Sequence, residues 1–156
     1  MKFFRKFFYT ISSIVVVFFL SLPTVQAQKK ASDIAGHWLN QDGDAKIEVF
    51  SRGGKYYGKL VWLKTPVDPD TQKPKLDKHN PDASLKSRPL MNLEILTAFV
   101  FDGDDEWTDG KIYDPKTGKT YSCLMKFESA NKLKIRGYIG VSWVGKTTIW
   151  SRTTAP

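Results

Sequence analysis

A few carboxylates are the natural starting point for any chemistry in this sequence. Asp77, Asp82 and Asp114 are the acidic residues that we consider for general acid–base catalysis. Their spacing selects no reaction, and an Asp in a turn such as Asp114–Pro115 normally bonds to nearby backbone amides. No catalytic residue is therefore predicted, and an enzyme is kept only as an alternative.

The segment 140–147 matches two catalytic patterns but lacks the context for either. Its residues fit the nucleotide-binding pattern G-x-x-x-x-G-K-[ST]. A P-loop must open a helix, whereas the residues after Thr147 are rich in β-branched types. Ser142 also resembles a nucleophile elbow, but the segment has one residue too many, and His37 and His79 both lie upstream. We expect a turn between the last two strands.

Metal-ligating residues are scarce. Zinc sites usually need three protein ligands, and the sequence has two His and a single cysteine, so only a site built with carboxylates stays open. The acidic run at 102–106 lacks the glycine of an EF-hand loop, and we expect a solvated hairpin tip. Cys123 alternates with Tyr121, Met125 and Phe127 and is expected to be a buried small hydrophobe. No metal and no cofactor are predicted.

Short alternating segments separated by turn residues must position these side chains. The clearest hairpin joins residues 46–52 to residues 56–63 across Gly53–Gly54. Further strands are expected around Trp38 and at residues 95–101, 107–113, 119–127, 132–138 and 146–152. A count of about eight at this regular spacing predicts an all-β sandwich or barrel.

One long segment interrupts this rhythm. Residues 65–92 hold five of the eight prolines, so they cannot form an interior strand. Loops of this length are usually functional lids or mobile segments. Because Leu76, Leu85, Leu90 and Met91 offer apolar anchors, we favour an ordered loop that covers the barrel.

The first 27 residues have the three parts of an export signal. Lys2, Arg5 and Lys6 precede an uncharged run of 16 residues, and a membrane span usually needs ~20. Cleavage after Ala27 would leave one domain, 28–156, in the periplasm or secreted, with membrane contact only through the signal. A retained anchor is the alternative. The domain keeps 21 cations against 16 acids, an excess too mild to predict nucleic acid as a partner.

A family resemblance is carried by blocks spread over the domain: Gly36-His-Trp38, Tyr57-Gly-Lys-Leu-Val-Trp62, Asp77, Asn80-Pro81, Arg88-Pro89-Leu90, Gly110-Lys-Ile-Tyr113-Asp114-Pro115, Leu133-Lys-Ile-Arg136-Gly-Tyr-Ile-Gly140 and Trp150-Ser-Arg152. They resemble a bacterial family of exported proteins known only as a domain of unknown function, DUF2147. Two features depart from that family: the chain lacks the cysteine pair that many members carry, and Asn92 stands where Gly is usual. The resemblance implies an address and a fold but no activity.

The chain is also similar to the calycin (lipocalin-like) group of up-and-down barrels, which have Gly-x-Trp on the first strand and Arg near the last. Trp38 and Arg152 occupy these places. The guanidinium can lie over the indole and close one barrel end, which is worth ~0.5–2 kcal/mol. The resemblance implies an antiparallel up-and-down β-barrel of about eight strands with a long Pro-rich loop.

An eight-stranded barrel either packs solid or holds one small ligand. A ligand would be small and apolar and would bind under the Pro-rich loop. The residues predicted to contact it are Trp107 and Tyr113 near a rim, Tyr121 and Met125 on a wall, and Asp77, Asn80 and Arg88 from the loop. The alternatives are a structural or protein-interaction domain of the cell envelope and an uncharacterised enzyme.

Overall fold

The computed structural model describes residues 29–156, and the predicted export signal at 1–27 lies outside them. Eight strands and two short 3-10 helices follow one another in this part of the chain. Their bounds are η1 (Ala31–Ile34), β1 (Gly36–Leu39), β2 (Ala45–Arg52), β3 (Lys55–Leu63), η2 (Ala83–Leu85), β4 (Glu94–Phe101), β5 (Glu106–Asp114), β6 (Lys119–Ser129), β7 (Lys132–Tyr138) and β8 (Gly145–Thr153). Within 29–156, no helix has the length and apolar character needed to cross a bilayer.

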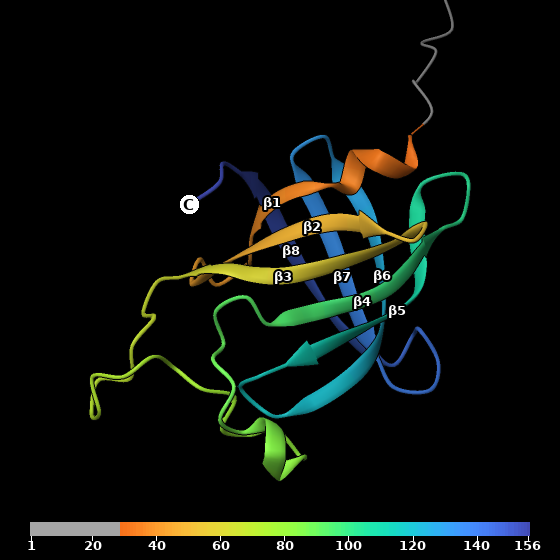
Figure 1. Ribbon diagram of the computed structural model, residues 1–156. Helices are drawn as coiled ribbons and strands as arrows, with labels where there is room; N and C mark the ends of the chain where they lie inside the picture. Colours follow the sequence, from red (N-terminus) through yellow and green to blue (C-terminus); the bar gives the residue numbers. More distant parts are fainter. Residues whose placement is uncertain (1–28) are drawn as a thin grey trace, which may run out of the picture.

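The strands close into one antiparallel barrel in chain order (Figure 1). Each strand pairs with the next, and the ring is completed between β1 and β8, where Trp38 lies opposite Arg152. Closure pairs the edges that an open sheet would leave exposed. This confirms the predicted up-and-down barrel of eight strands. The strands could be predicted because alternating runs and turn residues are local features of the sequence.

Side chains alternate between the interior and the surface along each strand, as the two-residue period requires. In β2, Ala45, Ile47 and Val49 are buried, and the residues between them are partly exposed. Across the interior, a Cβ atom at Gly110 would lie 2.3 Å from the ring of Phe99. Glycine at this position therefore leaves room for the Phe99 ring to fill the core.

One end of the barrel is packed solid and capped by η1, at the top of Figure 1. Trp38 and Trp107 are fully buried there. Their indole N–H groups donate to the backbone oxygens of Ile34 and Ala31, over 2.9 and 3.2 Å. Trp107, which was expected near a rim, lies at this capped end, where η1 folds over the barrel and leaves the indole with no exposed surface.

Arg152 fastens the same end from the last strand. Its guanidinium carbon lies 4.2 Å from the centre of a Trp38 indole ring. Its two terminal nitrogens donate to the backbone oxygens of Ala35 and Asp33, over 3.1 and 2.7 Å. The side chain thus joins β8, β1 and the segment containing η1, which is the geometry that the sequence pattern implies for closure of a barrel end.

The long connection between β3 and β4, residues 64–93, has defined structure. Two isolated bridges, Val67 with Pro74 and Leu76 with Pro89, fold it into hairpin-like pieces. Its end is tied to β3, because the Asn92 amide donates to the Leu60 carbonyl. Asn92 has a φ of 65°, a left-handed conformation that glycine adopts freely and asparagine tolerates. This explains how Asn can stand where the resembled family usually has Gly.

Candidate functional site

The end of the barrel opposite η1 is hollow. The β1–β2 and β5–β6 turns, the 64–93 loop and the β7–β8 loop meet there, because consecutive strands run antiparallel. A cavity of about 530 Å³ lies at this end. Its apolar floor is formed by core residues Ala45, Ile47, Leu60, Ile95 and Trp150. The hollow half of the barrel is therefore continuous with the packed half.

A second cavity of about 420 Å³ adjoins the first on the side of β6, β7 and β8. The two cavities share Ile112, Asp114, Lys146 and Thr148 in their linings. The two cavities are therefore neighbours at this end of the barrel, one on the side of the 64–93 loop and the other on the side of the β7–β8 loop.

The size of the inward-facing side chains explains why only one half is hollow. In the packed half, Phe99 and Trp107 cross the interior and are fully buried. In the hollow half, the inward positions include Ala45, Gly137 and Thr148, which line the two cavities. Small side chains at these places leave volume that the strands cannot collapse into, because the closed hydrogen-bond ring sets the barrel diameter.

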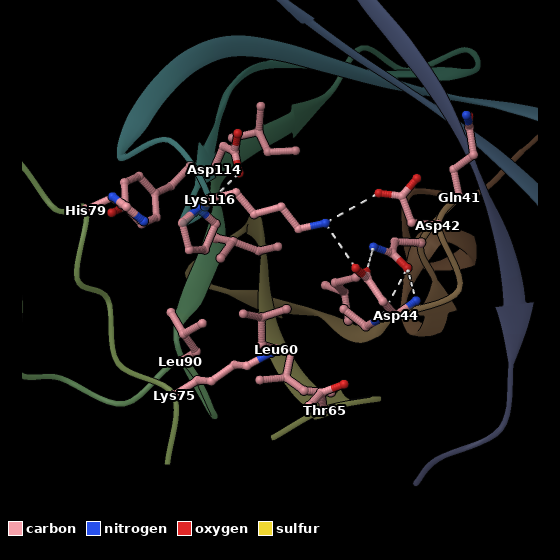
Figure 2. Close-up of a pocket in the computed structure, with 18 of the residues that line it drawn as sticks. Gln41, Asp42, Asp44, Leu60, Thr65, Lys75, His79, Leu90, Asp114 and Lys116 are labelled. Carbon is pink, nitrogen blue, oxygen red and sulfur yellow. Dashed lines mark hydrogen bonds and ion pairs between the residues drawn. The ribbon is translucent and has the colours of Figure 1, made fainter. Parts of the chain in front are cut away.

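Lys116 spans the mouth from the β5–β6 turn to the β1–β2 turn (Figure 2). Its Nζ lies 2.9 Å from Oδ2 of Asp44 and 3.5 Å from Oδ2 of Asp42. The hydrogen bond to Asp44 raises the pKa of Lys116. Burial opposes ionisation of Asp44, but hydrogen bonds from Asn40 and Lys116 outweigh it and lower the Asp44 pKa. Both groups are thus charged at neutral pH, and an ionic strap crosses part of the mouth.

Two lysines of the first cavity, Lys75 and Lys146, have no ion-pair partner within residues 29–156. The other lining lysine besides Lys116 is Lys78, which pairs with Asp68. Asp114 also lines the cavity, but its carboxylate accepts hydrogen bonds within its own turn. The lining therefore combines an apolar floor with two cations that lack a counter-ion.

Asp77 is fully buried beside the mouth, at the centre of a polar network whose other members are Tyr113, Asn80 and Arg88. Tyr113 donates its hydroxyl to Oδ1 over 2.5 Å, and Asn80 donates its amide to Oδ2 over 2.8 Å. Arg88 adds Nε and Nη2 at 2.9 and 2.8 Å from the same Oδ2. Burial opposes ionisation of Asp77, but these donors outweigh it and hold its pKa below the usual value. The pKa of Tyr113 is raised by burial and by its bond to this carboxylate.

This network joins the 64–93 loop to the barrel, because Asp77, Asn80 and Arg88 come from the loop and Tyr113 from β5. A second contact holds the loop against the β5–β6 turn. A Cβ atom at Gly118 would lie 1.9 Å from the carbonyl oxygen of His79, and Gly118 has a φ of +72°. The loop is thus a fixed wall of the mouth, and the satisfied carboxylate at its centre is typical of a structural anchor.

The structure places the residues predicted to contact a ligand in different parts of the barrel. Tyr113 lines the first cavity and Tyr121 lines the second. Asp77, Asn80 and Arg88 form the anchor network and belong to neither lining. For the loop residues, ligand contact stays a prediction, whereas their role in holding the loop follows from the hydrogen bonds.

Met125 and Trp107 lie in the packed half, and both have no exposed surface. Neither lines either of the two cavities, so both are core positions in this structure, and ligand contact by Met125 stays a prediction. The physical reason is that the alternating face of β6 runs through both halves of the barrel, and only its first residues reach the hollow half. Cys123, on the same face, is buried as predicted.

Most lining residues were not predicted from the sequence, and Lys146, Ile112 and Lys75 show three different reasons. Lys146 shares the inward parity of Thr148 and Trp150, so the two-residue period already placed it inside. Ile112 escaped because β5 has an irregular register between Trp107 and Gly110, which shifts the parity along the strand. Lys75 is in the loop, where no periodic signal exists.

Comparison with known proteins places this barrel in a wider group. A family model described as "Uncharacterized protein conserved in bacteria (DUF2147)" matches residues 36–152. No curated protein matches the chain significantly. Among solved structures, protein HP1028 from the human pathogen Helicobacter pylori, which is described as belonging to the lipocalin family, is 26% identical with a TM-score of 0.66 over 77% of this chain and 82% of that chain. The fold is therefore lipocalin-like, and the chain belongs to the DUF2147 family.

Proposed function

We propose that this protein binds a small, mostly apolar ligand with an acidic group in the hollow half of the barrel. The observation that carries the proposal is the cavity of about 530 Å³ with a floor of buried aliphatic and aromatic side chains. Ligand pockets usually measure ~300–1,000 Å³ and combine an apolar lining with a few polar groups. The likeness to a lipocalin-family structure supports the same function.

The acidic group follows from the charges at the mouth. Lys75 and Lys146 border the apolar space and lack an ion-pair partner in the described part of the chain. Next to a low-dielectric interior, an ammonium group attracts a carboxylate or sulfonate more strongly than it does in water. An apolar body would meanwhile gain ~25 cal/mol for each Å² removed from water. An amphipathic anion would match both features of the lining, the apolar floor and the two unpaired lysines.

The two alternative functions receive less support from this geometry. A solid scaffold or interaction module needs no cavity of ligand size. An enzyme that uses a free carboxylate as its acid or base receives less support, because Asp42, Asp44 and Asp68 are each held by a lysine and Asp114 by its own turn. Ligand binding is therefore the function that the arrangement supports best.

Titration with dodecanoate and dodecanol, followed by calorimetry, tests the proposal. The two probes share one chain, and only dodecanoate carries a charge. We expect dodecanoate to bind more tightly, and Ile112→Trp to abolish binding of both, because Ile112 lines both cavities. Lys146→Met should weaken dodecanoate about fivefold, equivalent to ~1 kcal/mol, and leave dodecanol unchanged.

Lys111→Met is the matched control, since Lys111 is exposed and neighbours Ile112 in the strand without lining a cavity. Its affinities should equal those of the wild type. Absence of binding for both probes, together with no co-purified ligand in native mass spectrometry, would refute the proposal. Equal binding by wild type and Ile112→Trp would place the ligand elsewhere.

We also propose that the chain is exported to the periplasm or beyond and cut after Ala27. Support comes from the charged start, the apolar run and the small residue at Ala27. Intact mass analysis of the protein from separate cell fractions is the test, and the expected mature chain begins at Gln28. Uncut protein recovered from the cytosol would contradict this address.

A further inference from the structure

The β7–β8 loop, residues 139–144, exposes an unusual concentration of apolar surface. Ile139 is 69% exposed, Val141 42%, Trp143 79% and Val144 56%. Only three other large apolar side chains among residues 29–156 are exposed, and they lie in separate elements. Contiguous exposed apolar surface on a soluble protein marks an interaction site. We call the four side chains of this loop the apolar tip.

The apolar tip is held in place by hydrogen bonds and is not a frayed end. The amide of Ile139 donates to the carbonyl of Val144 over 3.2 Å, and the amide of Val144 donates to the carbonyl of Val141 over 3.0 Å. Arg136 donates Nε to the Ser142 carbonyl over 2.5 Å. The backbone of the loop is thus hydrogen-bonded locally while the side chains stay exposed. In Figure 1 the loop projects from the barrel after β7.

The two strands that carry the apolar tip bear cations and no carboxylate, with Arg136 and Lys146 toward the tip and Arg152 at the capped end. Residues 132–153 contain five cations, Lys132, Lys134, Arg136, Lys146 and Arg152, and no carboxylate. None of the five forms an ion pair within residues 29–156. Arg136 and Lys146 lie closest to the tip along the two strands. An apolar tip with cations behind it complements a surface that is apolar inside and anionic outside.

We infer that the apolar tip inserts into the interfacial region of an anionic lipid bilayer. Tryptophan prefers that region because it has an apolar ring and a polar N–H. Basic residues behind it are attracted by acidic headgroups, with an effect that falls as salt rises. The absence of carboxylates from the two strands matches an anionic bilayer, whereas binding to a protein partner would not require it. The chain would bind from the water side as a peripheral protein.

The place of the apolar tip links membrane contact to the cavity. Ile139 and Val144 belong to the tip and also line the second cavity. A docked barrel would therefore hold this opening against the lipid, where an amphipathic anion is most concentrated. This inference goes beyond ligand binding, since a barrel could bind a soluble ligand without touching a membrane.

Vesicle sedimentation with the purified protein tests the inference. The vesicles are phosphatidylcholine alone and phosphatidylcholine mixed in equal parts with phosphatidylglycerol. We expect binding to the mixed vesicles, weaker binding at high salt and little binding to phosphatidylcholine alone. Trp143→Ser should reduce the partition coefficient about tenfold or more, and brominated lipids should quench the wild-type fluorescence more than that of the variant.

Val100→Ser is the matched control, because Val100 is a large apolar residue that is 37% exposed on β4 and lies outside the tip. It should bind vesicles like the wild type. Trp143→Ser should still bind dodecanoate with unchanged affinity, because Trp143 lines neither cavity.

No binding to either vesicle, or equal binding by wild type and Trp143→Ser, would overturn the inference. Self-association that Trp143→Ser removes, without vesicle binding, would assign the tip to contacts between copies of the chain and would also overturn it. Vesicle binding by a protein that binds neither dodecanoate nor dodecanol and carries no co-purified ligand would sustain the membrane contact and refute the proposed ligand, so the two failures are distinguishable.

Discussion

Replacement of Tyr113 by Phe removes one hydroxyl from the anchor network and keeps the aromatic ring. The ring stays in place beside the Arg88 guanidinium, whose central carbon lies 5.7 Å from the ring centre. The change therefore isolates the hydrogen bond of 2.5 Å from the tyrosine to Asp77. Asn80 and Arg88 still donate to the other carboxylate oxygen, so the charge of Asp77 keeps two partners.

A hydrogen bond to a charged group contributes ~1.5–3 kcal/mol, and loss of one partner leaves the acceptor buried. Asp77 has no exposed surface, but its remaining donors limit the penalty. We therefore expect Tyr113→Phe to lower the free energy of unfolding at pH 7 by ~1.5–2 kcal/mol. Where the loop opens locally, the same loss should appear as faster amide exchange at Asp77 and Leu90, whose amides donate within the loop.

The loss in free energy of unfolding caused by Tyr113→Phe should depend on pH, both at acidic and at basic pH. Because the folded pKa of Asp77 is lowered, its stabilisation is complete above the unfolded value near ~3.9 and disappears as pH falls through the folded pKa. The difference in free energy of unfolding between wild type and Tyr113→Phe should therefore shrink as pH falls through the folded pKa of Asp77. The folded pKa of Tyr113 is raised, so the stabilisation from its neutral hydroxyl is complete below ~10 and disappears as pH rises through the folded pKa.

Urea unfolding at several pH values, together with hydrogen exchange, measures these effects. Tyr138→Phe is the control, since the Tyr138 hydroxyl has no hydrogen bond within residues 29–156, and it should change stability by less than ~0.5 kcal/mol. Should Tyr113→Phe match this control in both measurements at pH 7, the buried network would not anchor the loop, and the reasoning would be refuted.

Three further outcomes are expected. Gly118→Ala should lower the free energy of unfolding by ~2–5 kcal/mol in urea unfolding. The new methyl group would lie 1.9 Å from the His79 carbonyl oxygen, in a left-handed backbone of φ +72°. An unchanged unfolding midpoint would contradict the packing of the loop against this turn. Arg152→Lys should lower stability by ~1–2 kcal/mol, since lysine cannot donate to two separate carbonyls while lying over Trp38, whereas Lys132→Arg at the neighbouring strand should be neutral. Burial raises the pKa of Cys123 to about 12, so an aromatic disulfide reagent at pH 8 should label the thiol only after unfolding, and rapid labelling of the native protein would refute its burial.

Much of the barrel could be predicted because its signals are local. Alternation along 46–52 and 56–63, broken by Gly53–Gly54, specifies the first hairpin without reference to any distant residue. Gly118 ends the turn that begins at Asp114–Pro115, and its φ of +72° is a conformation that glycine adopts freely. The strand count follows, and wherever the connection is a short turn the next strand is the expected neighbour; the pairing of β3 with β4 across residues 64–93 is the exception.

The site was less predictable because it depends on distances across the barrel. Asp77 and Tyr113 are 36 residues apart in the chain, and only the folded loop makes them partners. The register irregularity in β5 moved Ile112 into the cavity against the simple parity from Trp107. Sequence reasoning treated all inward positions of β6 alike, and so assigned Met125 to a ligand wall.

The amino-acid sequence by itself determined the all-β class, the approximate strands, the long Pro-rich loop and the family, because these rest on local periodicity, turn residues and short motifs. Tertiary structure alone decided which half of the barrel is hollow, which carboxylates are already paired and which lysines are not. Those properties arise from side-chain volumes and charges summed across eight strands, and no single segment of the chain contains that sum.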